Sequence, residues 1–170
     1  MNTCDVLIDS ARRNISQYPN SNNYVVVMKS PIRRIVSAEV IMSTFSKETN
    51  DIYTVLDIQE LKSDKLRAVY DSNQDSSIGV TVYPDGTSSN YYIASSSPGE
   101  SISRSFGVLP LADTPLNSNL VFTPSRYYTL KTDFVNQIDM DRFTVTWKDQ
   151  KGLPIPTSSN NSILLRIKHY

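Results

Sequence analysis

Two carboxylates have the spacing of an acid–base pair. Asp139 and Asp141 flank Met140, and residues two apart in an extended strand lie on one face, about 7 Å from each other. A glycosidase acid pair or a cation site could use that arrangement. The plainer interpretation is that both acids face water or pair with Arg142 and Lys148, because the sequence indicates no third ligand nearby. The sequence favours the plainer interpretation.

The remaining residues with catalytic or metal-binding chemistry are isolated. The chain contains one histidine, His169, and one cysteine, Cys4. Zinc sites need several such ligands, and a Ser-His-Asp triad needs a histidine base that is held in place. The five glycines do not form a phosphate-binding pattern. We therefore expect a protein that is not an enzyme and uses no metal or other cofactor.

The sequence contains two arginine pairs, Arg12-Arg13 and Arg33-Arg34, and ten tyrosines. Both features favour contacts with other proteins. The pairs could hold phosphate, nucleic acid or carboxylates of a neighbouring subunit, or they could be solvated charge. The 17 basic residues balance 17 acidic residues, and this formal net charge of +0 argues against nucleic acid. Tyrosine suits interfaces, sugar-binding surfaces and half-buried strand positions. The predicted assembly contacts are Arg12, Arg13, Tyr18, Arg33 and Arg34.

Apolar residues alternate with a period of two rather than 3.6, which predicts β-strands. The clearest case is 142–148, where Phe143, Val145 and Trp147 share one face. Alternation is poor in the first half of 32–43, so we expect a bulge or bend there. Helix is limited to one or two turns in 58–65 and possible turns in 5–14. The predicted strands are 24–28, 32–43, 52–58, 66–70, 78–83, 91–94, 104–109, 120–123, 142–148 and 162–168, with 127–131 uncertain.

A chain of 170 residues suits one domain. About ten short strands separated by turn signals predict an all-β, antiparallel β-sandwich of residues 24–170. Residues 1–23 show no strand pattern, so we expect a mostly irregular N-terminal arm that reaches a neighbouring subunit and becomes ordered on contact. No apolar run is long enough to span a bilayer, and the N-terminus lacks the order of a signal peptide. We therefore expect no membrane span and synthesis in the cytoplasm.

Several segments carry a resemblance to a known group of proteins. The pattern D-S-x-x-R, a spacer, Y-P-N-x-N-x-Y and then I-x-x-I-x-S-x-E-V runs from residue 9 to residue 40. Further similarity lies in 56–61, 106–111, 138–147 and 162–165. These segments resemble minor capsid and virion-associated proteins of large icosahedral double-stranded DNA viruses, the phycodnavirus and mimivirus group. Residues 43–45 depart from the pattern, because such proteins often have a proline-containing turn there.

The resemblance implies a single jelly roll, a place in the virion shell and no catalysis. The expected partners are other capsid proteins, above all the major capsid protein, and a homo-oligomer is possible. The expected role is a minor capsid component that stabilises or caps the capsid lattice, made in the host cytoplasm. The alternative is a carbohydrate-binding β-sandwich module on a virion or cell surface. A hydrolase using Asp139 and Asp141 would need a deep pocket around both acids.

The alternation in 142–148 predicts that Phe143, Val145 and Trp147 lie in the core. Replacing Trp147 by alanine should lower the free energy of unfolding by about 3–5 kcal/mol, because the change removes apolar burial and leaves a cavity. Urea denaturation of the two proteins measures the difference. A cost below about 1 kcal/mol, as at exposed sites, would show that Trp147 lies outside the core.

Overall fold

The chain folds as an all-β protein with almost no helix. The computed structural model describes residues 1–61, 67–69, 92–94, 105–150, 152–156 and 159–170, with the backbone alone for 67–69 and 92–94. The strands of this part are β1 (Asn2–Asp9), β2 (Asn23–Lys47), β3 (Tyr53–Ile58), β4 (Arg67–Val69), β5 (Tyr92–Ala94), β6 (Gly107–Pro110), β7 (Ser118–Phe122), β8 (Lys131–Lys148) and β9 (Ser162–His169). Two short 3-10 helices, η1 (Ser10–Arg12) and η2 (Gln59–Leu61), complete it. The all-β prediction is confirmed.

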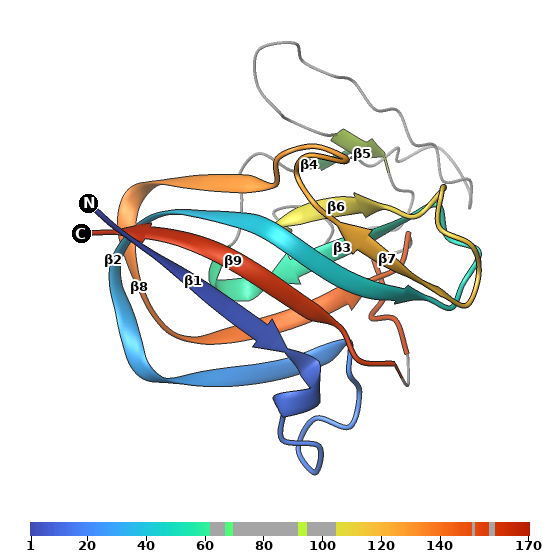
Figure 1. The fold of residues 1–170 in the computed structure, drawn as a ribbon, viewed down its shortest axis with the longest axis horizontal. Coiled ribbons are helices and arrows are strands. Elements are labelled where there is room, and N and C mark those ends of the chain that lie inside the picture. Colours follow the sequence, from blue (N-terminus) through green and yellow to red (C-terminus); the bar gives the residue numbers. More distant parts are fainter. Residues whose placement is uncertain (62–66, 70–91, 95–104, 151, 157–158) are drawn as a thin grey trace.

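Seven of the strands form one antiparallel sheet in the order β1-β9-β2-β8-β3-β6, with β7 paired to β2 beside this path. The sheet is strongly curled, so that it forms a half-barrel (Figure 1). The two long strands, β2 with 25 residues and β8 with 18, run through the curl from one half of the sheet to the other. A separate parallel pair joins β4 and β5.

The curl follows from irregularities in β2. Its pairing with β8 shifts register between Val27 and Ile32 and twice more before Ser37. Pro31 lies in the first shift and has no N–H for a ladder bond. Arg34 adopts a left-handed φ of 52°, a conformation that interrupts a regular strand. The predicted bend in the first half of 32–43 is confirmed, although 24–28 and 32–43 are one continuous bent strand.

The two halves of the curled sheet face each other across one hydrophobic core. Phe45, near the end of β2, contacts Trp147, near the end of β8, with ring centroids 4.7 Å apart. Phe143, Val145 and Trp147 are 1%, 0% and 0% exposed. Their predicted burial is confirmed, and the alternation that predicted it places Thr144 and Thr146 on the opposite, wetter face.

A buried polar network joins the ends of three segments. The Asn161 side-chain amide donates to the Ser21 carbonyl (2.7 Å) and to Asn22 Oδ1 (2.8 Å), and its Oδ1 accepts from the Tyr24 hydroxyl (3.0 Å). The Asn161 backbone N–H donates to Ser10 Oγ (2.8 Å). All five residues are almost fully buried, and burial raises the pKa of Tyr24 well above its ordinary value. The network fastens the end of β1, the start of β2 and the start of β9 to one another.

The prediction of an irregular arm over residues 1–23 is wrong for Asn2–Asp9. These residues form β1, which pairs with β9 along its whole length, and Ile8 belongs to the core. The predicted turns of helix in 5–14 are limited to η1 at Ser10–Arg12. The period-two pattern was present, since Cys4, Val6 and Ile8 face inward, but the run Val6-Leu7-Ile8 concealed it. Residues 13–22 lack regular secondary structure, as expected.

Other elements differ from the sequence predictions in extent. The helix expected in 58–65 is the single turn η2, and β8 begins eleven residues before the predicted strand 142–148. β6 and β7 lie within a few residues of the predicted 104–109 and 120–123. The predicted strand 78–83 lies outside the described residues. Strand β5 pairs in parallel with β4.

The network predicts a large difference between two adjacent asparagines. Asn161→Ala removes the partner of the Tyr24 hydroxyl and the donor to Asn22 Oδ1, both of which are buried, and each such group costs about 1–3 kcal/mol. We expect a loss of at least about 2 kcal/mol in the free energy of unfolding from urea denaturation. Asn160→Ala is the matched control, because Asn160 is exposed and its side chain accepts longer bonds of 3.4 and 3.1 Å. Equal losses in the two variants would contradict the structural role of the network.

Candidate functional site

The strongest candidate for a functional surface is the open edge of β1. Within the described residues, β9 is the strand that β1 pairs with. The Ser10 N–H donates to the Asn161 carbonyl (3.0 Å), so these two residues occupy the position of a hydrogen-bonded pair, although the Asn161 N–H donates to Ser10 Oγ. Because such pairs alternate along an antiparallel ladder, the backbone groups of Cys4, Val6 and Ile8 also point toward β9. Those of the residues between them point to the open edge.

The β1 edge lacks the features that usually protect a sheet edge. Protected edges are short, bulged, or carry proline or lysine, whereas β1 has eight residues, an unbroken register, and no proline, lysine or arginine. Its two acids are engaged within the protein. Arg166 donates to both oxygens of Asp5 (2.9 and 3.0 Å), which lowers the pKa of Asp5, and Asp9 accepts from the Ala11 N–H. Leu7 is 59% exposed on the outer face. Such an edge is suited to pairing with another strand.

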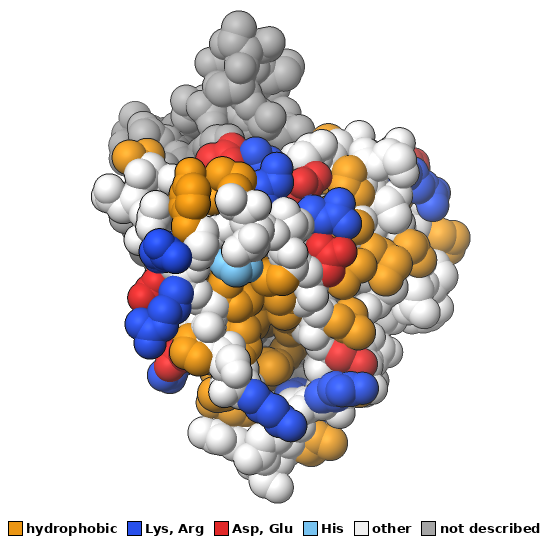
Figure 2. Space-filling model, turned by 60° about the vertical axis from the view of Figure 1, so that its left-hand side comes forward, with side chains coloured by type: hydrophobic (Ala, Val, Ile, Leu, Met, Phe, Trp, Pro, Cys, Tyr) orange, Lys and Arg blue, Asp and Glu red, His pale blue; other side chains and the backbone are white. Residues whose placement is uncertain are grey.

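An apolar hollow lies at the end of the molecule where β1 begins. Figure 2 shows hydrophobic side chains gathered in a depression that polar and charged side chains surround. Strand β1 and the first half of β2 both reach this end (Figure 1). Their inward-facing apolar side chains are only partly buried against the core, namely Cys4, Val6, Val26, Met28 and Ile32. A partner at the β1 edge would therefore also cover apolar surface.

The first group of predicted assembly contacts lies in the loop that follows β1. Arg13 is used within the chain: it donates to the carbonyls of Ser10 (2.7 Å), Tyr18 (2.9 Å) and Pro19 (3.0 Å), and also to Asn160 Oδ1 (3.1 Å). Tyr18 is half-buried and packs against the core. Arg12 is exposed. In this loop Arg13 and Tyr18 thus have structural roles, and Arg12 presents its charge to solvent.

The second group lies at the bend of β2. Arg33 and Arg34 are exposed and both contact Asp139 on β8. The Arg33 guanidinium lies 3.7 Å from the carboxylate, and the backbone N–H of Arg34 donates to it at 2.8 Å. The Arg34 carbonyl accepts from the Tyr170 N–H (3.2 Å). These contacts hold the left-handed turn of β2 against β8 and the chain end, while the Arg34 side chain projects outward.

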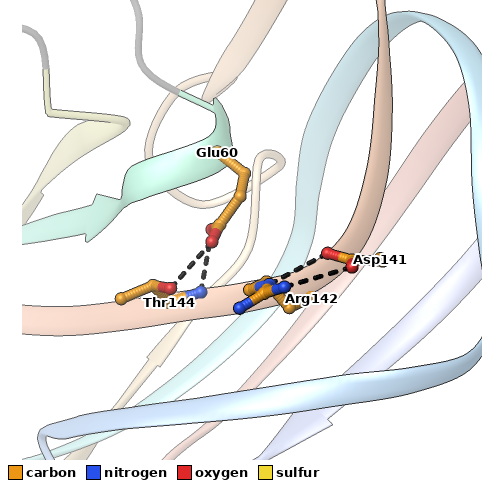
Figure 3. Close-up of polar contacts among 4 residues, drawn as sticks. All are labelled: Glu60, Asp141, Arg142 and Thr144. Atoms are coloured by element: carbon orange, nitrogen blue, oxygen red, sulfur yellow. Dashed lines mark hydrogen bonds and ion pairs between the residues drawn. The ribbon is translucent and has the colours of Figure 1, made fainter.

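The pair Asp139 and Asp141 lacks the environment of a general acid. Both side chains are 57% exposed. Arg142 donates two hydrogen bonds to Asp141 (2.9 and 3.2 Å), which lowers the pKa of that carboxyl (Figure 3). A glycosidase acid needs a raised pKa, which burial and a neighbouring negative charge provide. Both acids are exposed and Asp141 pairs with Arg142, as the plainer interpretation of the sequence predicts, but Asp139 pairs with Arg33, and Lys148 pairs with Asp57 instead.

Sequence reasoning missed the role of Glu60. Strand β3 ends at Ile58, opposite Val145, so the β3 side of β8 has no strand neighbour at Thr144, whose other neighbour is Val25 of β2. Glu60 of η2 supplies the acceptors: Oε2 accepts from the Thr144 N–H (2.8 Å) and Oε1 from its hydroxyl (2.7 Å) (Figure 3). The signal in the sequence was an acid two residues after a strand. Glu60 completes the hydrogen bonds of β8 where the sheet edge begins.

No protein-family model matches the chain, and no curated protein sequence matches it. Among the residues that the structure describes, no three histidine, cysteine, aspartate or glutamate side chains gather as a metal site would require. In the same part of the chain, no helix has the length and apolar character to cross a membrane. The surface features above are therefore the basis for a functional proposal.

Proposed function

We propose that this protein is a non-enzymatic structural component of a viral capsid, a minor capsid protein that stabilises or caps the lattice through protein–protein contacts. The observation that carries the proposal is the unprotected edge of β1 beside an apolar hollow. An exposed regular edge and a contiguous apolar surface are liabilities for an isolated protein and assets for a permanently assembled one. The proposed neighbours are other capsid proteins, above all the major capsid protein.

The finer fold that accompanies this proposal is a single jelly roll. Its support is the way in which the curled sheet folds over, so that β2 and β8 contribute to both faces of one core. The two sheets of a β-sandwich enclose their core in the same way. The proposed location is the virion shell, after synthesis in the host cytoplasm.

The alternative, a carbohydrate-binding module, would use exposed aromatic rings in a row. Of the tyrosines whose side chains the structure describes, Tyr24 and Tyr53 are buried. Tyr127 and Tyr128 contact Phe122, with ring centroids 5.4 and 5.7 Å away. Tyr170 is exposed, and the other exposed large hydrophobic residues in this part of the chain are aliphatic. No row of rings is present in this part of the chain, so no observation favours the alternative.

Quantitative mass spectrometry of purified virus particles tests the proposal. We expect the protein at a fixed ratio to the major capsid protein, retained when the particles are washed at high salt, because contacts of backbone and apolar groups are little screened. Absence from washed particles would overturn the proposal. Retention of the purified protein on a glycan array, together with that absence, would establish the carbohydrate-binding alternative.

A further inference from the structure

We infer that the β1 edge binds the β1 edge of a second copy of this chain, antiparallel and about a two-fold axis at Val6. This inference rests on the proposed function, because it names one partner of the same assembly surface. A two-fold interface uses the same patch on both subunits, so the patch must be complementary to itself. The features of β1 meet that requirement.

The backbone of β1 is complementary to itself. The groups that point to the open edge belong to Thr3, Asp5, Leu7 and Asp9, because the ladder to β9 uses the residues between them. Each offers one N–H and one C=O to a neighbouring strand. Two such edges in antiparallel orientation can pair these odd-numbered residues with each other. The unbroken register of β1 with β9 keeps the edge regular over this length.

Charge selects one register among those that pair odd-numbered residues. Placing the axis at Asp5 would set Asp5 opposite its own copy, and placing it at Leu7 would set Asp5 opposite Asp9. Like charges directly opposite each other destabilise a strand pair. With the axis at Val6, Asp5 lies opposite Leu7 and Asp9 lies opposite Thr3. This register therefore pairs residues 3–9 of the two strands along their length and places no carboxylate opposite another carboxylate.

The same register also places apolar groups together. Val6 lies opposite Val6 of the second copy, and Cys4 lies opposite Ile8, all on the inward face of the strand. The formal net charge of +0 leaves no long-range repulsion between copies.

Disulfide cross-linking tests the register. Val6 would form a non-hydrogen-bonded pair with its copy, and the Cα separation of about 4.5 Å at such pairs lies within the range for a disulfide. We expect the Cys4→Ala, Val6→Cys protein to oxidise to a covalent dimer as its main species on non-reducing gels. The matched control is Cys4→Ala, Val121→Cys, which places a cysteine on the outer face of β7 and should stay monomeric. Equal cross-linking of both proteins, or of neither, would overturn the inference.

A proline on the open edge tests the backbone contacts. The Leu7 N–H points away from β9, so Leu7→Pro removes no bond within the sheet, and edge strands tolerate proline there. By light scattering we expect a wild-type mass of twice 19.2 kDa, a mass of 19.2 kDa for Leu7→Pro and a dimer for Leu7→Ala, which keeps the N–H. A monomeric wild type at all concentrations would refute self-association; if particles nevertheless contain the protein, the proposed function stands. A dimeric wild type that is absent from particles would refute the proposed function alone.

Discussion

The remainder of the fold depends on the hydrogen bonds of one buried residue, Asn161. Its side chain meets Ser21, Asn22 and Tyr24 where β2 begins, and its backbone meets Ser10 where β1 ends. These segments are separated from Asn161 by more than a hundred residues of sequence. A buried network of this kind is strong when every member is satisfied and costly when one is removed. It fixes the first strand of the chain beside the last one.

That attachment leaves β1 with two unlike sides. Toward β9 its backbone is bonded over eight residues, and its inward side chains join or border the core. On the other side its backbone and Leu7 meet solvent. The bend of β2 at Pro31 and Arg34 curls the sheet without closing it. The attachment of β1 and the bend of β2 together leave an open strand edge and an apolar hollow at one end of the molecule.

The sequence predicted local features well and long-range pairing poorly. Phe143, Val145 and Trp147 alternate with polar residues, and this alone placed them in the core. In contrast, the apolar run Val6-Leu7-Ile8 hid the alternation of β1, and its partner β9 lies at the opposite end of the chain. For the candidate surface, Arg33 and Arg34 were predicted as assembly contacts, and both are exposed at the bend of β2. The open edge was not recognised, because an edge is a property of strand order, which no local pattern contains. Arg13 was expected to contact another subunit, yet carbonyls of its own loop surround it.

Residue-resolved amide hydrogen exchange of β1 tests the central claim most directly, measured at a concentration low enough that light scattering gives the mass of the monomer. If β1 is bonded on one side and open on the other, the amides of Cys4, Val6 and Ile8 exchange slowly. Those of Thr3, Asp5 and Leu7 then exchange quickly, because protection follows hydrogen bonding and burial. Uniformly fast exchange over residues 2–9 would show that this segment is a mobile arm. Uniformly slow exchange would show that the edge is already covered within the monomer, and either result would contradict the account.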